Sequence, residues 1–255
     1  MINGPASANY DEEAGLIWLT DWDHRTADAM YPAAETGGEP EMQTGLFNNT
    51  NIWTLDNGTV VGQRFETSLT PGNSYRLRVI NSAMSTLFKF EIDNHNLTVI
   101  AADLVPVEPY TVETLAVGVA QRFDVILTLN QADVATDFWM RAIPQICASY
   151  DPLINNTDIK GILHYGNSTG QPATSAFNYT SSCDDETQLH YSDLVPVVPV
   201  NVEKATWFDT EDSGVNLNSA GYYRWYMGPT NFIAEWNNPT LMQIYNDDGI
   251  ISNTT

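Results

Sequence analysis

Histidine and cysteine are scarce in this chain, and their spacing excludes the usual clustered metal sites. The 255 residues include four histidines and two cysteines. No His-X-His pair occurs, and neither cysteine has a histidine beside it. Tightly bound copper or zinc needs several imidazoles or thiolates close together. We therefore predict that this chain alone binds no metal.

Basic residues are also few. The chain has 10 lysines and arginines against 32 acidic residues, which gives a net charge of -22 and a pI near 4.1. Proteins that bind nucleic acids gain affinity by neutralising phosphates with Lys and Arg, so no nucleic-acid partner is expected. The acidic residues are dispersed among aromatic and β-branched residues, which is typical of a folded protein with a soluble, self-repelling surface.

Membrane and secretion signals are absent, although glycosylation motifs are present. The chain has no run of about 18 apolar residues, so no membrane association is expected. Met1-Ile2-Asn3-Gly4-Pro5 lacks the basic and apolar stretches of a secretory signal. Asn-X-Ser/Thr acceptor sequences are nevertheless typical of a secreted glycoprotein, although an Asn- and Thr-rich chain also produces some by chance. The glycosylation candidates are Asn48, Asn57, Asn96, Asn155, Asn167, Asn178 and Asn253.

Familiar hydrolase and nucleotide motifs are missing too. The chain contains no Gly-X-Ser-X-Gly elbow, no phosphate-binding loop and no Gly-X-Gly-X-X-Gly sequence. A secreted acidic protein could be a glycosidase, which uses two carboxylates, but nothing in the sequence singles out a pair. No catalytic residue is assigned.

Strand-like alternation dominates what the chain does contain. Phe88, Phe90 and Ile92 alternate with Lys89 and other charged residues, which predicts a half-buried β-strand. Residues 97–100, 115–117 and 123–127 repeat strand-favouring patterns, and residues 70–73 (Thr-Pro-Gly-Asn) predict a tight turn. Short strands in close succession predict an all-β sandwich.

The pattern is weaker in two regions. Residues 23–44 contain Pro32, Gly37-Gly38 and Pro40, which predicts a surface excursion with at most a short helical turn at 26–30. Residues 195–200 resemble an extended linker, 201–221 read as irregular, and 222–233 predict another strand. We expect exposed apolar surface beyond about Asn201.

The run from Phe88 to Leu127 resembles the second cupredoxin-like domain of fungal, ascomycete-type laccases. These are multicopper oxidases that oxidise phenols and reduce dioxygen to water. Further strings resemble that family in the same order along the chain. They are Ile2–Ser7, Leu19–Trp22, Arg76–Asn81, Ala101–Val107 and Trp225–Leu241.

The resemblance implies a cupredoxin-like Greek-key β-sandwich with an irregular C-terminal extension. Residues 1–7 would end a first cupredoxin domain, and 8–195 would form the second, plastocyanin-like domain. Residues 196–221 would be a linker, and 222–255 would begin an incomplete third domain. The abrupt ends at Met1 and Thr255 favour a partial gene model or partial cDNA, which would make the chain a fragment.

Copper chemistry in the family depends on His-X-His motifs of the first and third domains and on a His-Cys-His motif. This chain lacks them, so the resemblance implies copper in the parent protein and none bound by this chain alone. The isolated chain is expected to be inactive. It would form part of the wall of the substrate pocket and pack against the neighbouring domains. Its partners would be the flanking cupredoxin domains and, in the parent protein, a phenolic small-molecule substrate.

Family position also marks a substrate-binding region. Glu39 and Pro40, in a Gly-Glu-Pro loop, correspond to pocket-lining residues, and Ser85 falls where many members place an acid that accepts the phenolic proton. Serine cannot serve as that carboxylate. Either a neighbour such as Glu39 substitutes, or phenol oxidation in the parent is weaker or less pH-dependent. Ordinary surface loops are the alternative for both stretches.

Cys147 and Cys183 are compatible either with one bridge or with two free thiols. The family carries a disulfide in this region, so the resemblance implies that they pair. A structural, hydrogen-bonded role is favoured for His24, which follows Asp-Trp-Asp, and for His95, which lies in a polar turn. His164 shows no partner in sequence.

Two functional hypotheses remain after these observations. The chain is part of a secreted laccase-like oxidase, or it is a non-catalytic secreted cupredoxin-like binding or scaffold module. The missing metal ligands fit both.

Overall fold

The computed structural model describes residues 6–38, 40–145, 154, 156–185, 213–228, 230–231 and 237–246. The chain forms two compact units. The first comprises Met1–His24 with Glu41–Val200, and the second comprises Arg25–Pro40 with Asn201–Thr255.

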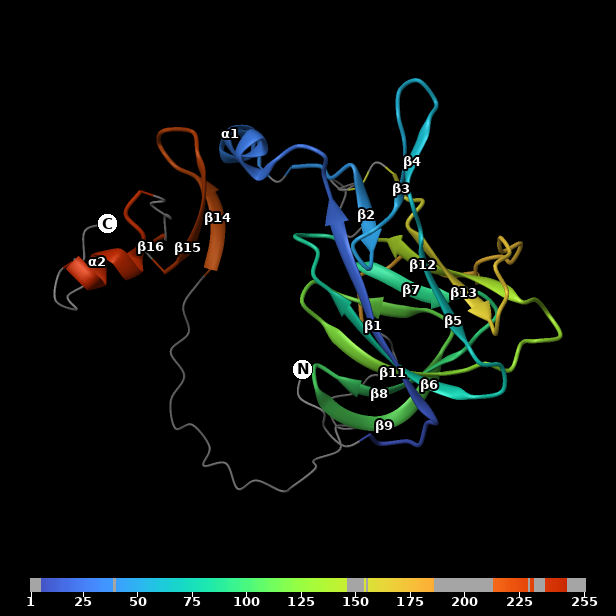
Figure 1. The fold of residues 1–255 in the computed structure, drawn as a ribbon. Helices are drawn as coiled ribbons and strands as arrows, with labels where there is room; N and C mark the ends of the chain where they lie inside the picture. The colour runs from blue at the N-terminus through green and yellow to red at the C-terminus, as the bar shows by residue number, and fades with distance from the viewer. Residues whose placement is uncertain are drawn as a thin grey trace, which may run out of the picture. The chain divides into compact units, whose positions relative to one another are not determined.

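The first unit is a sandwich of two β-sheets, as the alternating sequence pattern predicts (Figure 1). One sheet has six strands in the order β2-β1-β6-β11-β8-β9. Its strands are β1 (Glu12–Trp22), β2 (Thr44–Phe47), β6 (Ser74–Asn81), β8 (Leu97–Ala102), β9 (Val105–Val112) and β11 (Arg122–Thr128).

The second sheet has five strands in the order β10-β7-β12-β13-β5. The strand β1 pairs in parallel with β6, and β13 pairs in parallel with β5, so non-consecutive strands are neighbours in both sheets. A small hairpin of β3 (Ile52–Thr54) and β4 (Val60–Gly62) stands apart from them. The sheet strands are β5 (Phe65–Leu69), β7 (Phe88–Ile92), β10 (Leu115–Val117), β12 (Asp137–Pro144) and β13 (Lys160–Tyr165).

Aromatic side chains fill the space between the two sheets. Phe47, Phe88, Phe90 and Phe138 are all fully buried there. Each such side chain contributes roughly 1.5–3 kcal/mol on burial, and aliphatic side chains such as Val79 and Leu127 complete the core. The turn predicted at residues 70–73 is confirmed, because Asn73 donates to the carbonyl of Thr70 at 3.4 Å and Gly72 has φ +89°.

The prediction that β7 is only half-buried is wrong. Lys89 is 7% exposed and Glu91 is fully buried, because residues 171–182, which we call the strap, cover the outer face of this strand. The strap forms a hydrogen bond with each charged side chain on the outer face of β7 and with one in the turn that follows this strand. Asp93 accepts from the Thr174 hydroxyl at 2.7 Å, Glu91 accepts from the Phe177 N–H at 3.3 Å, and Lys89 donates to the Thr180 carbonyl at 2.9 Å.

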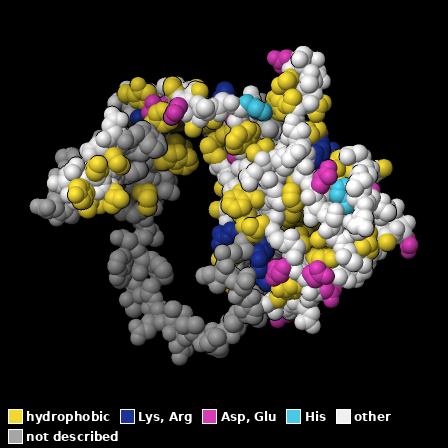
Figure 2. Space-filling view, in the orientation of Figure 1, with side chains coloured by type: hydrophobic (Ala, Val, Ile, Leu, Met, Phe, Trp, Pro, Cys, Tyr) yellow, Lys and Arg dark blue, Asp and Glu magenta, His cyan; other side chains and the backbone are white. Residues whose placement is uncertain are grey.

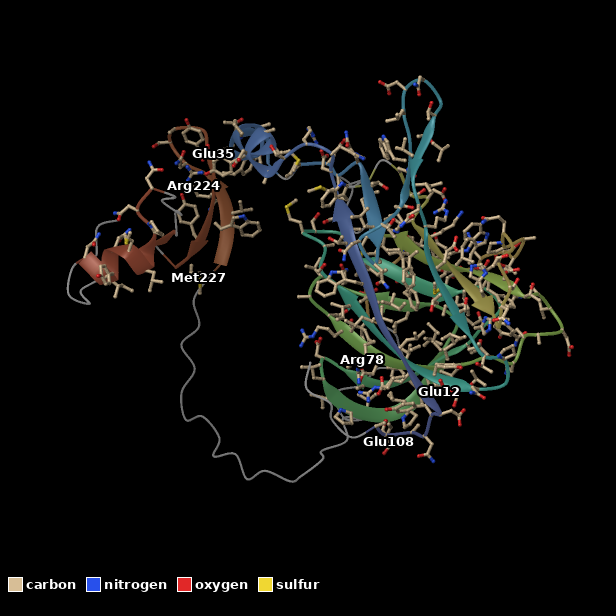
Figure 3. The ribbon with its side chains drawn as sticks, in the orientation of Figure 1. Glu12, Glu35, Arg78, Glu108, Arg224 and Met227 are labelled. Carbon is tan, nitrogen blue, oxygen red and sulfur yellow. The ribbon has the colours of Figure 1, made fainter. Side chains whose placement is uncertain are left out.

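The second unit contains more regular structure than the sequence predicts. The excursion at 23–44 includes an 11-residue helix whose N-cap, Thr26, accepts from the Ala29 N–H. Arg224 lies 3.2 Å from Glu35 on that helix (Figure 3). A strand at 213–217 also replaces the irregular segment expected there. The elements are α1 (Ala27–Gly37), β14 (Ser213–Leu217), β15 (Tyr223–Met227), β16 (Thr230–Asn231) and α2 (Thr240–Asn246).

Exposed apolar side chains are common in the described part of this unit beyond residue 213, as the sequence predicts. Trp225 is 76% exposed and Tyr245 is 82% exposed. Figure 2 shows hydrophobic side chains on the visible face of these elements. Exposed apolar surface of this kind is unusual for an isolated soluble domain and is typical of surfaces that contact another protein or domain. The other exposed members are Val215, Leu217, Tyr222, Tyr223, Met227, Leu241 and Met242.

Candidate functional site

The loop that follows β6 carries Ser85 and is held by a carboxylate from β1. Asp21, which is 7% exposed, accepts the backbone N–H groups of Met84 at 2.9 Å and Ser85 at 3.1 Å. It also accepts the hydroxyl of Thr86 at 3.2 Å. Successive N–H groups that converge on one carboxylate form a concave anion-binding arrangement, so Asp21 fixes the conformation of this loop.

A second side chain braces the same loop from within the fold. Asn81, at the end of β6, accepts the N–H of Ala83 at 2.9 Å and donates to the carbonyls of Thr86 and Val117, each at 2.8 Å. Both ends of the loop are therefore tied to the sandwich. A loop fixed in this way can present a side chain in a defined position.

The hydroxyl of Ser85 is buried and has no hydrogen-bond partner within the described residues. Its neighbour Met84 is 52% exposed, and Trp22 at the end of β1 is 47% exposed. A serine hydroxyl can donate one hydrogen bond and accept up to two, but it carries no charge at neutral pH. The hydroxyl at this position therefore cannot act as a carboxylate base.

The structure does not test the other two predicted substrate-binding residues. Glu39 lies outside the described residues. Pro40 is half-buried in the second unit, whereas Ser85 belongs to the first. Their role in one pocket stays a prediction.

Each histidine of the described residues has a protein partner. His24 lies 2.7 Å from the Gln43 amide oxygen, which confirms the structural role expected from sequence. His95 is fully buried, with one ring nitrogen 2.8 Å from the Asp93 carbonyl and the other 2.5 Å from the Tyr165 hydroxyl. Burial lowers the pKa of His95. His164, for which sequence shows no partner, lies 2.6 Å from Asp137.

A cavity of about 590 Å³ separates the strap from β12 and the segment before β13. Arg141 and Lys160 lie in its wall together with Tyr179 of the strap. Behind it, Arg141 donates two hydrogen bonds to Asp93, at 2.6 and 2.8 Å. Burial, and then the nearby Asp93 charge, raise the pKa of Glu91 to about 7. Sequence reasoning missed this cavity because its walls come from segments that are distant in the chain.

The cysteine and glycosylation predictions are only partly covered by the structure. Cys183 is disulfide-bonded, whereas Cys147 lies outside the described residues, as do Asn155 and Asn253. Within the described residues, no group of three or more His, Cys, Asp or Glu side chains is arranged to hold a metal ion. No helix there is long and apolar enough to span a membrane.

Comparison with known proteins gives a consistent result. A protein-family model described as "Multicopper oxidase" matches residues 13–168. Laccase-1 of Botryotinia fuckeliana is 38% identical over 253 residues, which cover 98% of this chain and 42% of that protein. A laccase of Neurospora crassa is 33% identical over 244 residues, covering 94% of this chain and 37% of the relative.

Solved structures agree with the sequence matches. The crystal structure of a laccase from Botrytis aclada superposes with a TM-score of 0.78 at 34% identity, covering 98% of this chain and 46% of that one. The cupredoxin-like Greek-key sandwich expected from sequence is therefore confirmed. The chain spans less than half the length of these relatives.

Proposed function

The chain belongs to the multicopper oxidase family, and we propose that it forms the second cupredoxin-like domain of a laccase-type enzyme that oxidises phenols and reduces dioxygen to water. The observation that carries this proposal is the match to fungal laccases along 98% of the chain. Residues 8–195 would be that domain, with 1–7 ending a first domain, 196–221 forming a linker and 222–255 beginning a third.

The described residues of this chain include no group of three or more metal-binding side chains that could hold copper. The described histidines His24, His95 and His164 come from separate parts of the first unit, and each has a ring nitrogen within hydrogen-bonding distance of a protein oxygen. A blue copper site needs two imidazoles and a thiolate around one ion. Copper ligands in the parent enzyme would come from other domains, and this chain would supply pocket wall and interdomain packing.

Exposed apolar side chains support the interdomain role. Trp225, Met227 and Leu241 are each more than two-thirds exposed in the second unit. Large exposed apolar groups mark surfaces that another protein surface covers. The flanking cupredoxin domains of the parent are the proposed partners, and an extracellular location is proposed from the laccase relatives.

Ser85 is proposed to contact the phenolic substrate of the parent. Phenol oxidation is easier when the hydroxyl proton can leave with the electron, and a nearby carboxylate accepts that proton well. Ser85 can donate a hydrogen bond to the phenol oxygen, but it cannot remove the proton. The enzyme is therefore expected to oxidise phenols slowly and with a weak pH dependence, unless Glu39 supplies the missing base.

The test is Ser85→Asp in the copper-loaded full-length enzyme. The new carboxylate would lie close to Asp21, whose negative charge is expected to raise the pKa of the introduced group and make it a better base. We expect kcat/KM for a phenol to rise about tenfold or more, with a new acid-side pH dependence. Oxidation of a donor that has no ionisable proton should not change.

Ser85→Ala is the matched control, because it removes the hydroxyl without adding a base. If Ser85→Asp changes the rates of phenolic and proton-free donors equally, Ser85 does not lie at the phenol. Glu39→Gln in the same enzyme decides whether Glu39 serves as the base, because it would then lower phenol oxidation selectively.

The shortage of metal ligands also supports a second candidate, a non-catalytic secreted module with this fold. The intact mass of the native polypeptide after glycan removal separates the two. A mass about twice the 28.3 kDa of this chain or more supports the oxidase. A mass near 28.3 kDa supports the module.

A further inference from the structure

A small polar cavity lies where β8 begins. Its volume is about 170 Å³, which is far more than a single water molecule needs. Every side chain that lines it ends in an amide or a hydroxyl, and none is charged or aromatic. The lining residues are Asn94, Asn96, Thr98, Thr128, Asn130 and Gln131.

Strand register explains why these residues meet. Leu97 of β8 lies opposite Leu127 of β11, and both side chains are fully buried in the sandwich. Since neighbouring side chains on a strand point to opposite faces, Asn96 and Thr128 lie on the outer face of the sheet. Asn94 lies in the turn before β8, has a positive φ of +63°, and also lines the cavity.

Asn96 is also the acceptor of an Asn-Leu-Thr sequence, and its side chain is exposed. No hydrogen bond involves its amide among the described residues. The acceptor Asn48 is different, because its oxygen accepts the Trp18 N–H at 2.6 Å and its nitrogen donates to the Leu16 carbonyl at 3.0 Å. Attaching a sugar to that nitrogen would disturb the pairing, whereas the Asn96 nitrogen is available.

We propose that Asn96 carries an N-linked glycan whose first N-acetylhexosamine lies in this cavity. The Asn96 amide nitrogen loses one proton and bonds to the anomeric carbon of an oligosaccharide, whose bond to a lipid diphosphate breaks. No group is oxidised or reduced. The hydroxyl and acetamido groups of the sugar need both donors and acceptors, which the amides and hydroxyls of the lining provide.

The cavity suits a tethered sugar better than a free one. Free sugars are usually held by an aromatic platform, and individual neutral hydrogen bonds contribute little net free energy against the entropy lost on association. A covalent bond to Asn96 converts the contact into an intramolecular one, so that weak hydrogen bonds suffice. The glycan therefore becomes a structural part of the end of the sheet where β8 begins and β11 ends.

The experiment uses the full chain secreted from a fungal host, and it rests on the extracellular location proposed above. Glycopeptide mass spectrometry is expected to find Asn96 occupied and Asn48 unmodified. Trimming the native protein to one sugar per site should leave Tm unchanged. Asn96→Gln, which removes the whole glycan, should lower Tm by about 2–4 °C. The control Asn178→Gln, at an exposed acceptor in the strap, should have no effect on Tm.

Thr128→Val tests the cavity itself, because it removes a lining hydroxyl and keeps the acceptor sequence. We expect the glycan at Asn96 to remain and native digestion by peptide N-glycosidase to become faster. An unoccupied Asn96 would overturn the proposal, and so would equal Tm shifts for Asn96→Gln and Asn178→Gln. These readouts do not involve oxidase activity, so they can fail or succeed independently of the proposed function.

Discussion

The carboxylate of Asp21 accepts the backbone N–H of Ser85 at 3.1 Å, so a residue of β1 fixes the loop at the far end of β6. The same carboxylate accepts the N–H of Met84 and the hydroxyl of Thr86. The position of Ser85 therefore depends on a side chain that would not itself touch the proposed substrate.

Asp21→Asn is expected to destabilise the first unit and to loosen this loop. An asparagine amide offers one acceptor oxygen, and its NH2 group would face the loop N–H groups, which would then be buried without partners. The expected loss is about 1–3 kcal/mol in the free energy of unfolding, measured with urea. Amide exchange at Met84 and Ser85 should become faster.

The control is Asp56→Asn, because Asp56 is exposed in the small hairpin. Its effect should lie within about 0.5 kcal/mol of zero. Equal losses for the two variants would show that Asp21 has no special role in holding the loop.

Glu91 is expected to make stability depend on pH. Its pKa is raised to about 7 in the folded chain from 4.5, mainly by burial, so the folded state holds a proton that the unfolded state releases. The contribution of Glu91 to stability is then largest below pH 4.5 and is lost as pH rises through 7. The full difference is up to about 3 kcal/mol.

Glu91→Gln mimics the protonated form and keeps the acceptor for the Phe177 N–H. It should remove this part of the pH dependence and make the protein more stable than the parent at pH 8. Urea unfolding at pH 5 and pH 8 measures both effects. The exposed Glu108, labelled in Figure 3, provides the control Glu108→Gln, which should leave the pH dependence unchanged.

The buried pair His95 and Tyr165 should be sensitive to loss of one hydroxyl. Tyr165 lies 2.5 Å from a His95 ring nitrogen and accepts the Gln131 N–H at 3.2 Å. Tyr165→Phe leaves both groups without this partner while keeping the ring that packs on Phe138. We expect a loss of about 1–3 kcal/mol in urea unfolding.

The pKa of His95 is lowered by burial, so its protonation opposes folding. The unfolded state takes up a proton below about pH 6.5, and stability from this group decreases as pH falls through that value. His95→Gln should flatten this acid-side loss. An unchanged slope between pH 7 and pH 5 would contradict the assignment to His95.

Local patterns in the sequence predicted much of the sandwich but not what covers it. The alternation at Phe88 and Phe90 correctly identified the core face of β7. The burial of Glu91 was missed because it depends on the strap, and the Phe177 contact lies 86 positions further along the chain. The residue pattern within a strand does not show whether a distant segment of the chain covers its outer face.

The helix α1 was missed for a different reason. Pro32 and Gly37 argue against a helix, because proline removes a backbone donor and glycine costs conformational entropy. The N-cap at Thr26 and the contact between Glu35 and Arg224 compensate in the structure. The partners of Ser85 were likewise invisible, since Asp21 lies 64 positions before it.

Arg76 and Arg78 of β6 both lie beside carboxylates of neighbouring strands. Arg76, which is 5% exposed, donates a hydrogen bond to Asp124 on β11. Glu13 lies 3.5 Å from the same Arg76 guanidinium. The next basic residue, Arg78, is 3.9 Å from Asp124 and too distant to replace Arg76 fully. The ion pair between Arg76 and Asp124 is therefore largely buried, and neither charge has an equivalent replacement partner.

Arg76→Met should cost about 3 kcal/mol, because it leaves the Asp124 carboxylate buried without its main partner. Asp124→Asn should also destabilise, because it leaves a buried guanidinium with weaker acceptors. The double variant should lose less than the sum of the two single losses, since neither charge remains. Urea unfolding of the four proteins measures the coupling, and high salt should change it little because the pair is shielded from solvent. Additive losses would mean that Arg76 and Asp124 act independently and that no coupling between them stabilises the six-stranded sheet.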